Sequence, residues 1–510
     1  MTLLNIWKSV KRSTFPERTP IFATAHTQNL TEEEVQKARY LIPLESEKDS
    51  FFDYQELSKA SDTSSFREPN AFDKITIFAG SSATFFVILG FVGIWGFIGA
   101  LYGPTDTWQI MFQNASSIQV YIMDILLIRQ QQNSSRAMIT RLAEFSSRYT
   151  TLKRLLSRIP KNQEALISKQ ESRLLKINSD QIDEILDQSA FVPMEKSSRI
   201  TYYWVQACQV IARSLGSLYT FFLYWIGIGI WMILGPSLKF SDTWQLYINT
   251  ATALALTFTS VFLQNIQQRE EEKHSRFLEQ ALKIDSQIEK RLRLLTGDQK
   301  PNSIFSIPEP ERTRTERIND FLADVMGSGL GVLISLTFVA VWISIGPTLK
   351  FNDNWWLIIG SFTGLVGFVD GFVLRSLYYR EERFVKERFL SMATEDQLLF
   401  DQIEVSATTP EEPKRSFTDT VSLAISNGCG HRYAPPGAIA VVVALLITAT
   451  VMSWSITGQL LCNTPTMIIE GFLLIVLIHA HNYANNERRA DFTGLLIRRL
   501  HLLGFVEMLE

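Results

Sequence analysis

The chain has 510 residues, a formal net charge of −3 and 20% charged residues, and its length alone would allow about three or four soluble domains. Its mean hydropathy of +0.06 averages strongly apolar stretches with polar ones. Five stretches contain no Asp, Glu, Lys or Arg, and each can cross a ~30 Å hydrocarbon core at about 1.5 Å per residue. They are 75–105, 214–238, 243–268, 325–349 and 433–469. The composition therefore excludes a soluble enzyme as the main interpretation.

Apolar runs broken by turn residues predict eight membrane-spanning helices. Their approximate ranges are 76–101, 107–128, 214–235, 243–264, 326–346, 354–374, 437–458 and 465–484. The helices come in pairs with very short connections, and charged, helix-prone segments separate successive pairs. The predicted fold is an all-α integral membrane protein with four tandem two-helix hairpin repeats and cytoplasmic helical linkers.

Basic residues predict the orientation, because Lys and Arg are retained on the cytoplasmic side. Of the 49 Lys and Arg residues, only Lys239 and Lys350 lie in hairpin turns. Both termini and all linkers are therefore expected in the cytoplasm. The segments are an N-terminal segment at 1–73, hairpins at 74–130, 201–268, 325–376 and 435–487, linkers at 131–200, 269–324 and 377–434, and a tail at 488–510. The N-terminal segment shows no cleavable signal, and three scattered cysteines form no disulfide framework.

The four hairpins share a sequence pattern, which indicates an internal repeat. A Trp-x-x-x-Gly motif is expected to end each first helix: Trp95/Gly99, Trp231/Gly235, Trp342/Gly346 and Trp454/Gly458. Three copies also have a Gly-Ser pair at a constant spacing before the tryptophan and an Asp-x-Trp element at a constant spacing after it. The aspartates of these elements are Asp106, Asp242 and Asp353. The fourth copy has only Gly437, and Asn463 and Pro465 replace the Asp and Trp of that element.

The second copy carries a resemblance to a known family. Its motifs are Trp231-x-x-x-Gly235-Pro236, Ser241-Asp242-Thr243-Trp244-Gln245-Leu246-x-Ile248-Asn249-Thr250, Thr257-Phe258, Phe262-Leu263-Gln264-Asn265-x-Gln267, Arg269 and Lys283-x-Asp285. They resemble the low-affinity iron permease family, whose small bacterial members look like one such hairpin and whose fungal members are larger plasma-membrane proteins. The resemblance implies low-affinity uptake of ferrous iron, with copper, zinc and other divalent ions as additional substrates.

The second helix of copy two has one polar face, although that helix contains no charge. On a helical wheel Ser260, Gln264 and Gln267 share a side with Asn249. The aligned copies then predict two columns of side chains about 16 Å apart along the helices. The outer column is Gln113, Asn249, Gly360 and Glu470, and the inner column is Asp124, Ser260, Gly371 and His481. Oxygen and imidazole ligands suit ferrous iron and its neighbours.

Helix packing is the alternative interpretation of these faces. Gly360, Gly364, Gly367 and Gly371 of copy three contain Gly-x-x-x-Gly spacings that favour close helix contact. Ionisable residues inside a span are functional by default, which singles out Asp124, Asp370, Glu470 and His481. Asp370 points away from the inferred lumen, with Arg375 as a candidate partner, and His479 lies opposite His481 and is expected to pack or to lie at the interface.

The Asp-x-Trp elements also allow two interpretations. Asp106, Asp242 and Asp353 stand where a second helix begins, so helix capping explains them, and the tryptophans suit an aromatic belt. Alternatively, three carboxylates at an outer mouth raise the local cation concentration, an effect that salt screens.

We therefore expect a transporter of ferrous iron, with four hairpins around a cation pathway in approximate fourfold pseudosymmetry. The sequence shows no nucleotide-binding glycine loop and no catalytic constellation, so no enzyme activity, cofactor or nucleic-acid partner is expected. The expected partners are divalent metal cations and the lipid bilayer, and a homo-oligomer is left open. Two alternatives remain: a carrier mainly for copper or zinc, and a membrane scaffold that does not transport.

Overall fold

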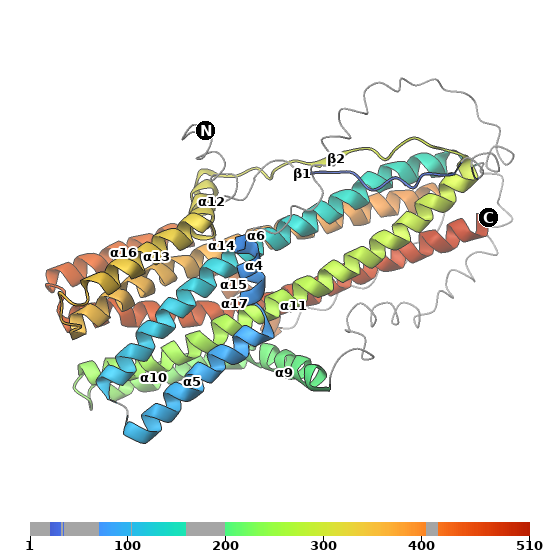
Figure 1. Ribbon diagram of the computed structural model, residues 1–510. Helices are drawn as coiled ribbons and strands as arrows, with labels where there is room; N and C mark the ends of the chain where they lie inside the picture. Colours follow the sequence, from blue (N-terminus) through green and yellow to red (C-terminus); the bar gives the residue numbers. More distant parts are fainter. Residues whose placement is uncertain are drawn as a thin grey trace.

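The computed structural model describes residues 21–31, 34, 71–103, 105–159, 199–403 and 417–509. Most of the predicted N-terminal segment, and parts of the linkers at 131–200 and 377–434, lie outside the described residues. Four long helices dominate the described chain, and a more apolar helix precedes each of them (Figure 1).

The four long helices contain 50 to 55 residues each, so they extend for ~75–83 Å. They are α6 (Asp106–Ser157), α11 (Asp242–Thr296), α14 (Asp353–Gln402) and α17 (Ile456–Leu509). α6 and α17 each pack against both α11 and α14, which makes a ring in the order α6, α11, α17, α14. Each helix runs without a break through a predicted second span and into the following linker or tail.

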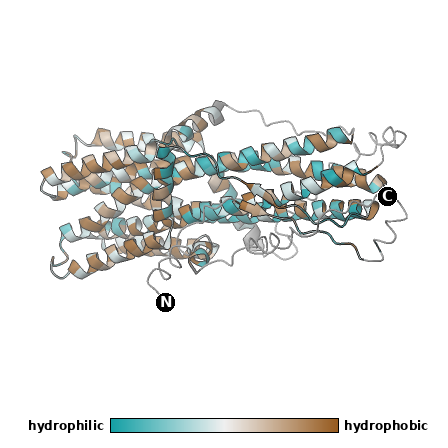
Figure 2. Cartoon of the chain, turned by 90° about the horizontal axis from the view of Figure 1, so that it is seen from above, coloured by the Kyte–Doolittle hydropathy of each residue, from teal (hydrophilic) through white to brown (hydrophobic). Residues whose placement is uncertain are grey.

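The helices that precede them in the hairpins are α5 (Ser82–Tyr102), α10 (Leu218–Leu234), α13 (Gly329–Ile345) and α16 (Ala434–Val451). They are apolar on all sides, and only 11% of the apolar window of α5 and 17% of that of α16 is buried, against 78% in α17. Figure 2 shows hydrophobic residues concentrated at the hairpin end and hydrophilic residues along the other half. A helix that is apolar all round and uncovered by protein is suited to lipid.

Another helix precedes each of these helices. The preceding helices are α4 (Ala71–Ala79), α9 (Arg199–Leu215), α12 (Arg314–Met326) and α15 (Phe417–Cys429). The bend is 58° between α9 and α10 and 60° between α12 and α13. The predicted first spans of copies one to three are thus broken at the Gly-Ser pair, because Ser81, Ser217 and Ser328 cap the following helix with their side chains.

The glycine at each bend packs against the long helix of a neighbouring hairpin. A Cβ on Gly80 would lie 2.9 Å from Cβ of Gln268 and 3.2 Å from the carbonyl oxygen of Gln264. The four pairs are Gly80 with Gln268, Gly216 with Asn482, Gly327 with Gln132, and Gly430 with Tyr379. The four partners occupy one equivalent position when the long helices are aligned at their first residues. These contacts follow the ring order of the long helices.

A tryptophan pair closes each of the first three hairpins. Trp231 and Trp244 stack with ring centroids 4.0 Å apart, and each indole N–H donates to the other's backbone carbonyl, at 3.0 and 2.9 Å. Equivalent stacked pairs are Trp95–Trp108 and Trp342–Trp355. In these hairpins the Trp-x-x-x-Gly and Asp-x-Trp motifs therefore supply the two halves of one contact.

The fourth hairpin corrects the predicted register. α16 ends at Val451 and α17 begins at Ile456, so Trp454 and Gly458 do not end the first helix. Ser453 and Trp454 have positive φ, as do Lys239–Phe240 and Lys350–Phe351. The Ser455 hydroxyl accepts from the Gly458 amide, as Ser241 accepts from Trp244. The turn thus matches the backbone of the turns in the second and third hairpins, and Trp454 stands where those two turns have Phe240 and Phe351.

Five described helices are long and apolar enough to cross a membrane, namely α5, α11, α14, α16 and α17, and seven spans result if each bent pair counts as one. α6 is not among them because glutamine, asparagine, serine and Asp124 interrupt its apolar sequence. Five to seven spans stand against the predicted eight, and the fold is that of an all-α membrane protein.

Beyond the bent helices the four long helices form a stalk, comprising residues 136–157, 272–296, 383–402 and 489–509. Apolar layers fill its interior, and buried ion pairs join its helices, including Arg499 with Asp285 and Asp396. One two-stranded antiparallel sheet departs from the predicted all-α fold: β1 (Ile21–Ala23) pairs with β2 (Phe305–Ile307). Both strands lie along α6 (Figure 1).

Candidate metal pathway

The four long helices can be aligned at the residues that cap them, which are Thr105, Ser241, Asn352 and Ser455. Eight residues after the cap stand Gln113, Asn249, Gly360 and Asn463. All four residues are buried. Neither the amide oxygen nor the amide nitrogen of Asn249 has a hydrogen-bond partner, and the amide oxygen of Asn463 has none. This amide layer therefore contains oxygen atoms that are available to a ligand.

Three of the four residues predicted for the outer column, Gln113, Asn249 and Gly360, stand at this layer, whereas Glu470 does not. Glu470 stands seven residues beyond Asn463, so it lies about 10 Å deeper along the axis. The sequence alignment matched Trp454 to the tryptophans of the other first helices, although its backbone matches Phe240 and Phe351. The same shift puts Leu474, not His481, level with Asp124, Ser260 and Gly371.

The glycines of α14 make room for polar side chains of neighbouring helices. A Cβ on Gly360 would lie 2.7 Å from Oδ1 of Asn114, and one on Gly364 would lie 2.5 Å from Oδ1 of Asn463. A Cβ on Gly367 would lie 2.6 Å from Oε1 of Glu470. The glycine series is therefore a packing surface, as its spacing indicated, and the groups packed on it are polar.

Four hydroxyl groups form the next layer, eleven residues after the caps. They belong to Ser116, Thr252, Thr363 and Thr466, all buried. The three threonines donate to the carbonyl four residues earlier on their own helix, which leaves the hydroxyl oxygen free to accept or to bind a cation. The two predicted columns did not include this layer, and the error in the fourth register placed Thr466 out of line with the other three residues.

Carboxylates follow at the next depth. Asp124, Asp370 and Glu470 come from α6, α14 and α17, and all three are at least 95% buried. The charged groups that act on Glu470 are Asp124 and Asp370, so the three carboxylates lie within electrostatic range of one another. Both oxygens of Asp124 and both of Asp370 lack a hydrogen-bond partner. Carboxylates buried in this way need a cation or a proton.

Two further predicted metal residues, Ser260 and Gln113, have hydrogen-bond partners in the protein. Ser260, level with Asp124, accepts a hydrogen bond from Gln119 at 3.1 Å, and Gln113 donates to the carbonyl of Leu246 and to Thr250. The ring of His481 lies 4.5 Å from that of Tyr378, and its Nδ1 has no partner. His481 therefore lies deeper than the carboxylates, in a layer with Gln131 and Gln267.

The structure also shows the contacts of Arg375 and His479. Arg375 forms no salt bridge with Asp370 in the described chain; its Nη2 donates to the carbonyl of Leu473 at 2.7 Å. His479 donates from Nδ1 to the carbonyl of Gly216 at 2.5 Å. His479 is thus a packed residue at a helix bend, as expected.

The aspartates of the Asp-x-Trp elements are not helix caps. The capping side chains belong to the preceding residues, Thr105, Ser241 and Asn352, each of which accepts from a tryptophan amide. Asp106, Asp242 and Asp353 are the first residues of their helices. Asp106 and Asp242 are exposed, and Asp242 accepts from the Thr457 hydroxyl at 3.3 Å. The tryptophans of these elements stack on the tryptophans of the preceding helices in the first three hairpins.

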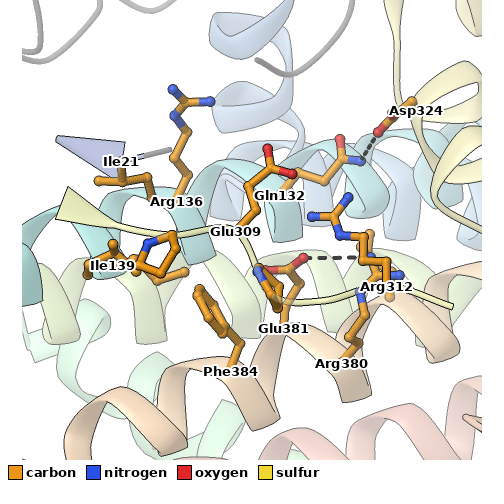
Figure 3. Close-up of a pocket in the computed structure, with 14 residues that line it drawn as sticks. Ile21, Gln132, Arg136, Ile139, Glu309, Arg312, Asp324, Arg380, Glu381 and Phe384 are labelled. Carbon is orange, nitrogen blue, oxygen red and sulfur yellow. Dashed lines mark hydrogen bonds and ion pairs between the residues drawn. The ribbon is translucent and has the colours of Figure 1, made fainter. Parts of the chain in front are cut away.

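A cavity at the start of the stalk is separate from this polar core. Figure 3 shows its lining, which contains none of the predicted metal residues. Gln132 donates to Asp324 there at 3.2 Å. The charged residues in the lining are three arginines and three acids: Arg136, Arg312, Arg380, Glu309, Asp324 and Glu381. Their balanced charge does not favour a cation site.

Within the described residues, no three His, Cys, Asp or Glu side chains are grouped closely enough to hold a metal ion. The core consists instead of layers along one axis: amides, hydroxyls and then dispersed carboxylates. Apolar helices with little buried surface stand outside this core. These features define an all-α, multi-pass membrane protein with a polar interior.

The comparisons with known proteins give the family. The chain matches the sequence model for low affinity iron permease over residues 70–189, 205–295, 315–392 and 418–500. It is 40% identical over 437 residues to the low-affinity iron/zinc ion transport protein fet4 of Schizosaccharomyces pombe, which covers 85% of this chain and 72% of that protein. It is 35% identical over 458 residues to the low-affinity Fe(2+) transport protein of Saccharomyces cerevisiae, covering 84% and 81%.

The chain therefore belongs to the low affinity iron permease family. Members of this family are transporters and not enzymes. No solved structure matches the chain.

Proposed function

We propose that this protein transports divalent metal cations with low affinity across the plasma membrane, with ferrous iron as its main substrate. The relatives named above are an iron/zinc and an Fe(2+) transport protein, which supports iron first and zinc as a further substrate. The single observation that carries the proposal is that Asp124, Asp370 and Glu470, from three of the four long helices, are buried within electrostatic range of one another.

The cation moves along the axis of that ring. It meets amide oxygens, then hydroxyls and then the carboxylates, whose mutual repulsion a divalent cation relieves. Amide and hydroxyl oxygens are weak ligands, which fits low affinity and fast release. A divalent cation that moves inward through 100 mV gains roughly 2 × 2.3 kcal/mol, so transport proceeds without a nucleotide or a bound cofactor.

The membrane topology is part of the proposal. Four hairpins give eight spans with both termini in the cytoplasm, and α6 is the eighth span. α6 does not need the apolar composition of a lipid-facing helix, because it packs between α11 and α14 and most residues from Asp106 to Gln130 are buried or half-buried. The stalk is then cytoplasmic.

Ferrous iron uptake into sealed vesicles that contain only this protein tests the function, with an imposed inward-negative potential. The variant is Glu470→Gln with Asp124→Asn, at equal abundance, and Glu279→Gln on the stalk surface is the matched control. We expect uptake by the parent and the control, and loss of uptake by the double variant. If the parent admits neither iron nor zinc above empty vesicles, the transport proposal fails and the scaffold interpretation replaces it.

A further inference from the structure

Two apolar rings interrupt the polar core, one near each end. The inner ring lies just beyond the carboxylates and consists of one leucine from the same aligned position of each long helix: Leu127, Leu263, Leu374 and Leu477. All four are at least 96% buried and belong to one hydrophobic cluster. The four helices differ in sequence at most other inward positions, yet each has a leucine here.

The outer ring lies just inside the caps, ahead of the amide layer. Ile110, Leu246, Leu357 and Leu460 share one aligned position and form a separate cluster in which every member is at least 92% buried. The two rings are ~26 Å apart along the helices, as Leu246 and Leu263 are on α11. The amide, hydroxyl and carboxylate layers all lie between them. The polar core is therefore a compartment with an apolar closure at each end.

Polar groups also lie beyond the inner ring, so the ring separates two polar regions. Four residues deeper, Gln267 donates to Gln131 at 3.0 Å. Below that layer the stalk is filled by further apolar contacts, among them Leu142, Leu278 and Phe389. An ion that passes the inner ring must therefore leave sideways between the ring and the stalk.

We infer that these two rings are the gates of the transport path and that both are closed in this structure. The inference rests on the proposed function. A hydrated cation cannot enter a buried aliphatic constriction without losing its water, and such constrictions close channels by excluding water. The closed rings hold the polar core away from both solutions and keep monovalent ions from leaking through it.

The helix bends couple the inner gate to the outer layer of helices. Asn265, two residues after Leu263, donates to the carbonyl of Gly80 at 2.8 Å. His479, two residues after Leu477, contacts the carbonyl of Gly216. Two leucines of the ring thus stand beside residues that are hydrogen-bonded to a bend, so a change in bend angle shifts the ring. The outer ring has no such contact to a bend among the interactions of the described chain, which makes the inner ring the one that the bends move.

Thiol labelling tests the gates without measuring iron transport. Cys208, Cys429 and Cys462 are replaced by alanine, and Ser260→Cys places a probe between the rings. A membrane-impermeant cationic methanethiosulfonate is then applied from either side. The inner-gate variant is Leu263→Asn with Leu477→Asn, the outer-gate variant is Leu246→Asn with Leu460→Asn, and the control is Leu223→Asn with Leu333→Asn on lipid-facing surfaces.

We expect the probe to be protected in the parent and in the control. The inner-gate variant should raise the labelling rate from the stalk side by at least about tenfold, which is ~1.4 kcal/mol of barrier, and the outer-gate variant should do so only from the turn side. The variant with all four asparagines should conduct Na⁺ and K⁺. If neither pair changes labelling and the combined variant does not conduct, the gate inference is wrong.

Two further measurements keep the outcome clear. If an asparagine variant does not elute as a monodisperse protein, alanine variants at the same positions replace it. If the inference holds, they are labelled faster from the same side as expected for the asparagine variants. If it does not hold, they are labelled as slowly as the parent. Ferrous iron uptake by the parent is measured in the same vesicles. Absence of uptake overturns the proposed function, whereas the labelling pattern decides the gates in either case.

Discussion

The carboxylate of Glu470 on α17 lies directly against the backbone of Gly367 on α14. A Cβ at position 367 would stand 2.6 Å from Oε1 and 3.1 Å from Oε2 of that carboxylate. Glu470 can occupy this place only because residue 367 has no side chain. The position of one predicted metal ligand therefore depends on a glycine of the neighbouring hairpin.

Gly367→Ala is expected to reduce uptake without removing any ligand. The added methyl group overpacks the interface by about 1–3 kcal/mol and displaces the Glu470 carboxylate, so the apparent affinity for ferrous iron should fall roughly tenfold. Initial uptake rates over a range of iron concentrations measure this. Gly93→Ala is the control, because a Cβ there would meet nothing within 4 Å. Equal affinities in the two variants would contradict a role for Glu470 on the path.

The sequence predicted the helices well because burial in lipid requires long uncharged stretches. The span predicted at 107–128 falls on α6, whose apolar sequence is interrupted by buried polar residues, so α6 is not among the helices that are apolar enough to cross a membrane. The fourth register failed because identity matched Trp454 with Trp231, whereas the positive φ of Ser453 and Trp454 shows the true correspondence. The strand pair β1–β2 joins segments that are far apart in the chain, as in the pairing of Phe22 with Ser306, and no local pattern indicates it.

The tryptophan pairs should contribute measurably to stability. Trp231→Phe keeps an aromatic ring but removes the indole N–H that donates to Trp244, so we expect a loss of about 1 kcal/mol. Thermal unfolding in detergent measures the change as a lower Tm. Trp225→Phe, on a partly lipid-exposed surface of α10, should leave the Tm unchanged. Equal shifts in both variants would show that the stacked pair has no special role.

The stability of the stalk depends on buried ion pairs, and removing one partner of such a pair is strongly destabilising. Arg499 lies within 3.3 Å of Asp285 and 2.9 Å of Asp396, and all three side chains are at least 99% buried. Arg499→Met leaves two buried carboxylates with less compensation, which costs about 3–5 kcal/mol. Unfolding of the purified protein should occur at a clearly lower temperature. Arg291→Met breaks an exposed pair with Glu507 and should change stability by at most about 1 kcal/mol.

The stability of the protein should depend on pH because of Glu271, which lies on α11 beyond the proposed span. Burial raises the pKa of Glu271 from 4.5 to about 8, although hydrogen bonds to Gln130 and Ser134 oppose the shift. The folded protein therefore holds this proton more tightly than the unfolded chain does, and stability is lost as pH rises from about 4.5 to about 8. Glu271→Gln removes this loss.

The difference in Tm between Glu271→Gln and the parent tests this sign. The variant should gain Tm over the parent at about pH 9 and show little gain at about pH 4. Glu279→Gln removes an exposed carboxylate that pairs with Lys283 and should show no gain at either pH. A gain for Glu271→Gln that is the same at both values would mean that titration of this carboxyl is not its cause.

The aspartates at the hairpin turns should act on ion capture at long range. Asp106 and Asp242 are exposed, and Thr105 and Ser241 already cap their helices, so replacing both aspartates by asparagine should leave the Tm almost unchanged. Two negative charges are lost at the mouth of the path, so the apparent KM for ferrous iron should rise at low ionic strength while the maximal rate stays the same. Because the Debye length falls from about 10 Å at 0.1 M salt to about 3 Å at 1 M, the difference in KM between parent and variant should shrink as salt is added.

Glu272→Gln, an exposed change on the stalk, should not alter KM at any salt concentration. A KM difference that persists at high salt would point to direct ion contact by Asp106 or Asp242 rather than attraction through solvent.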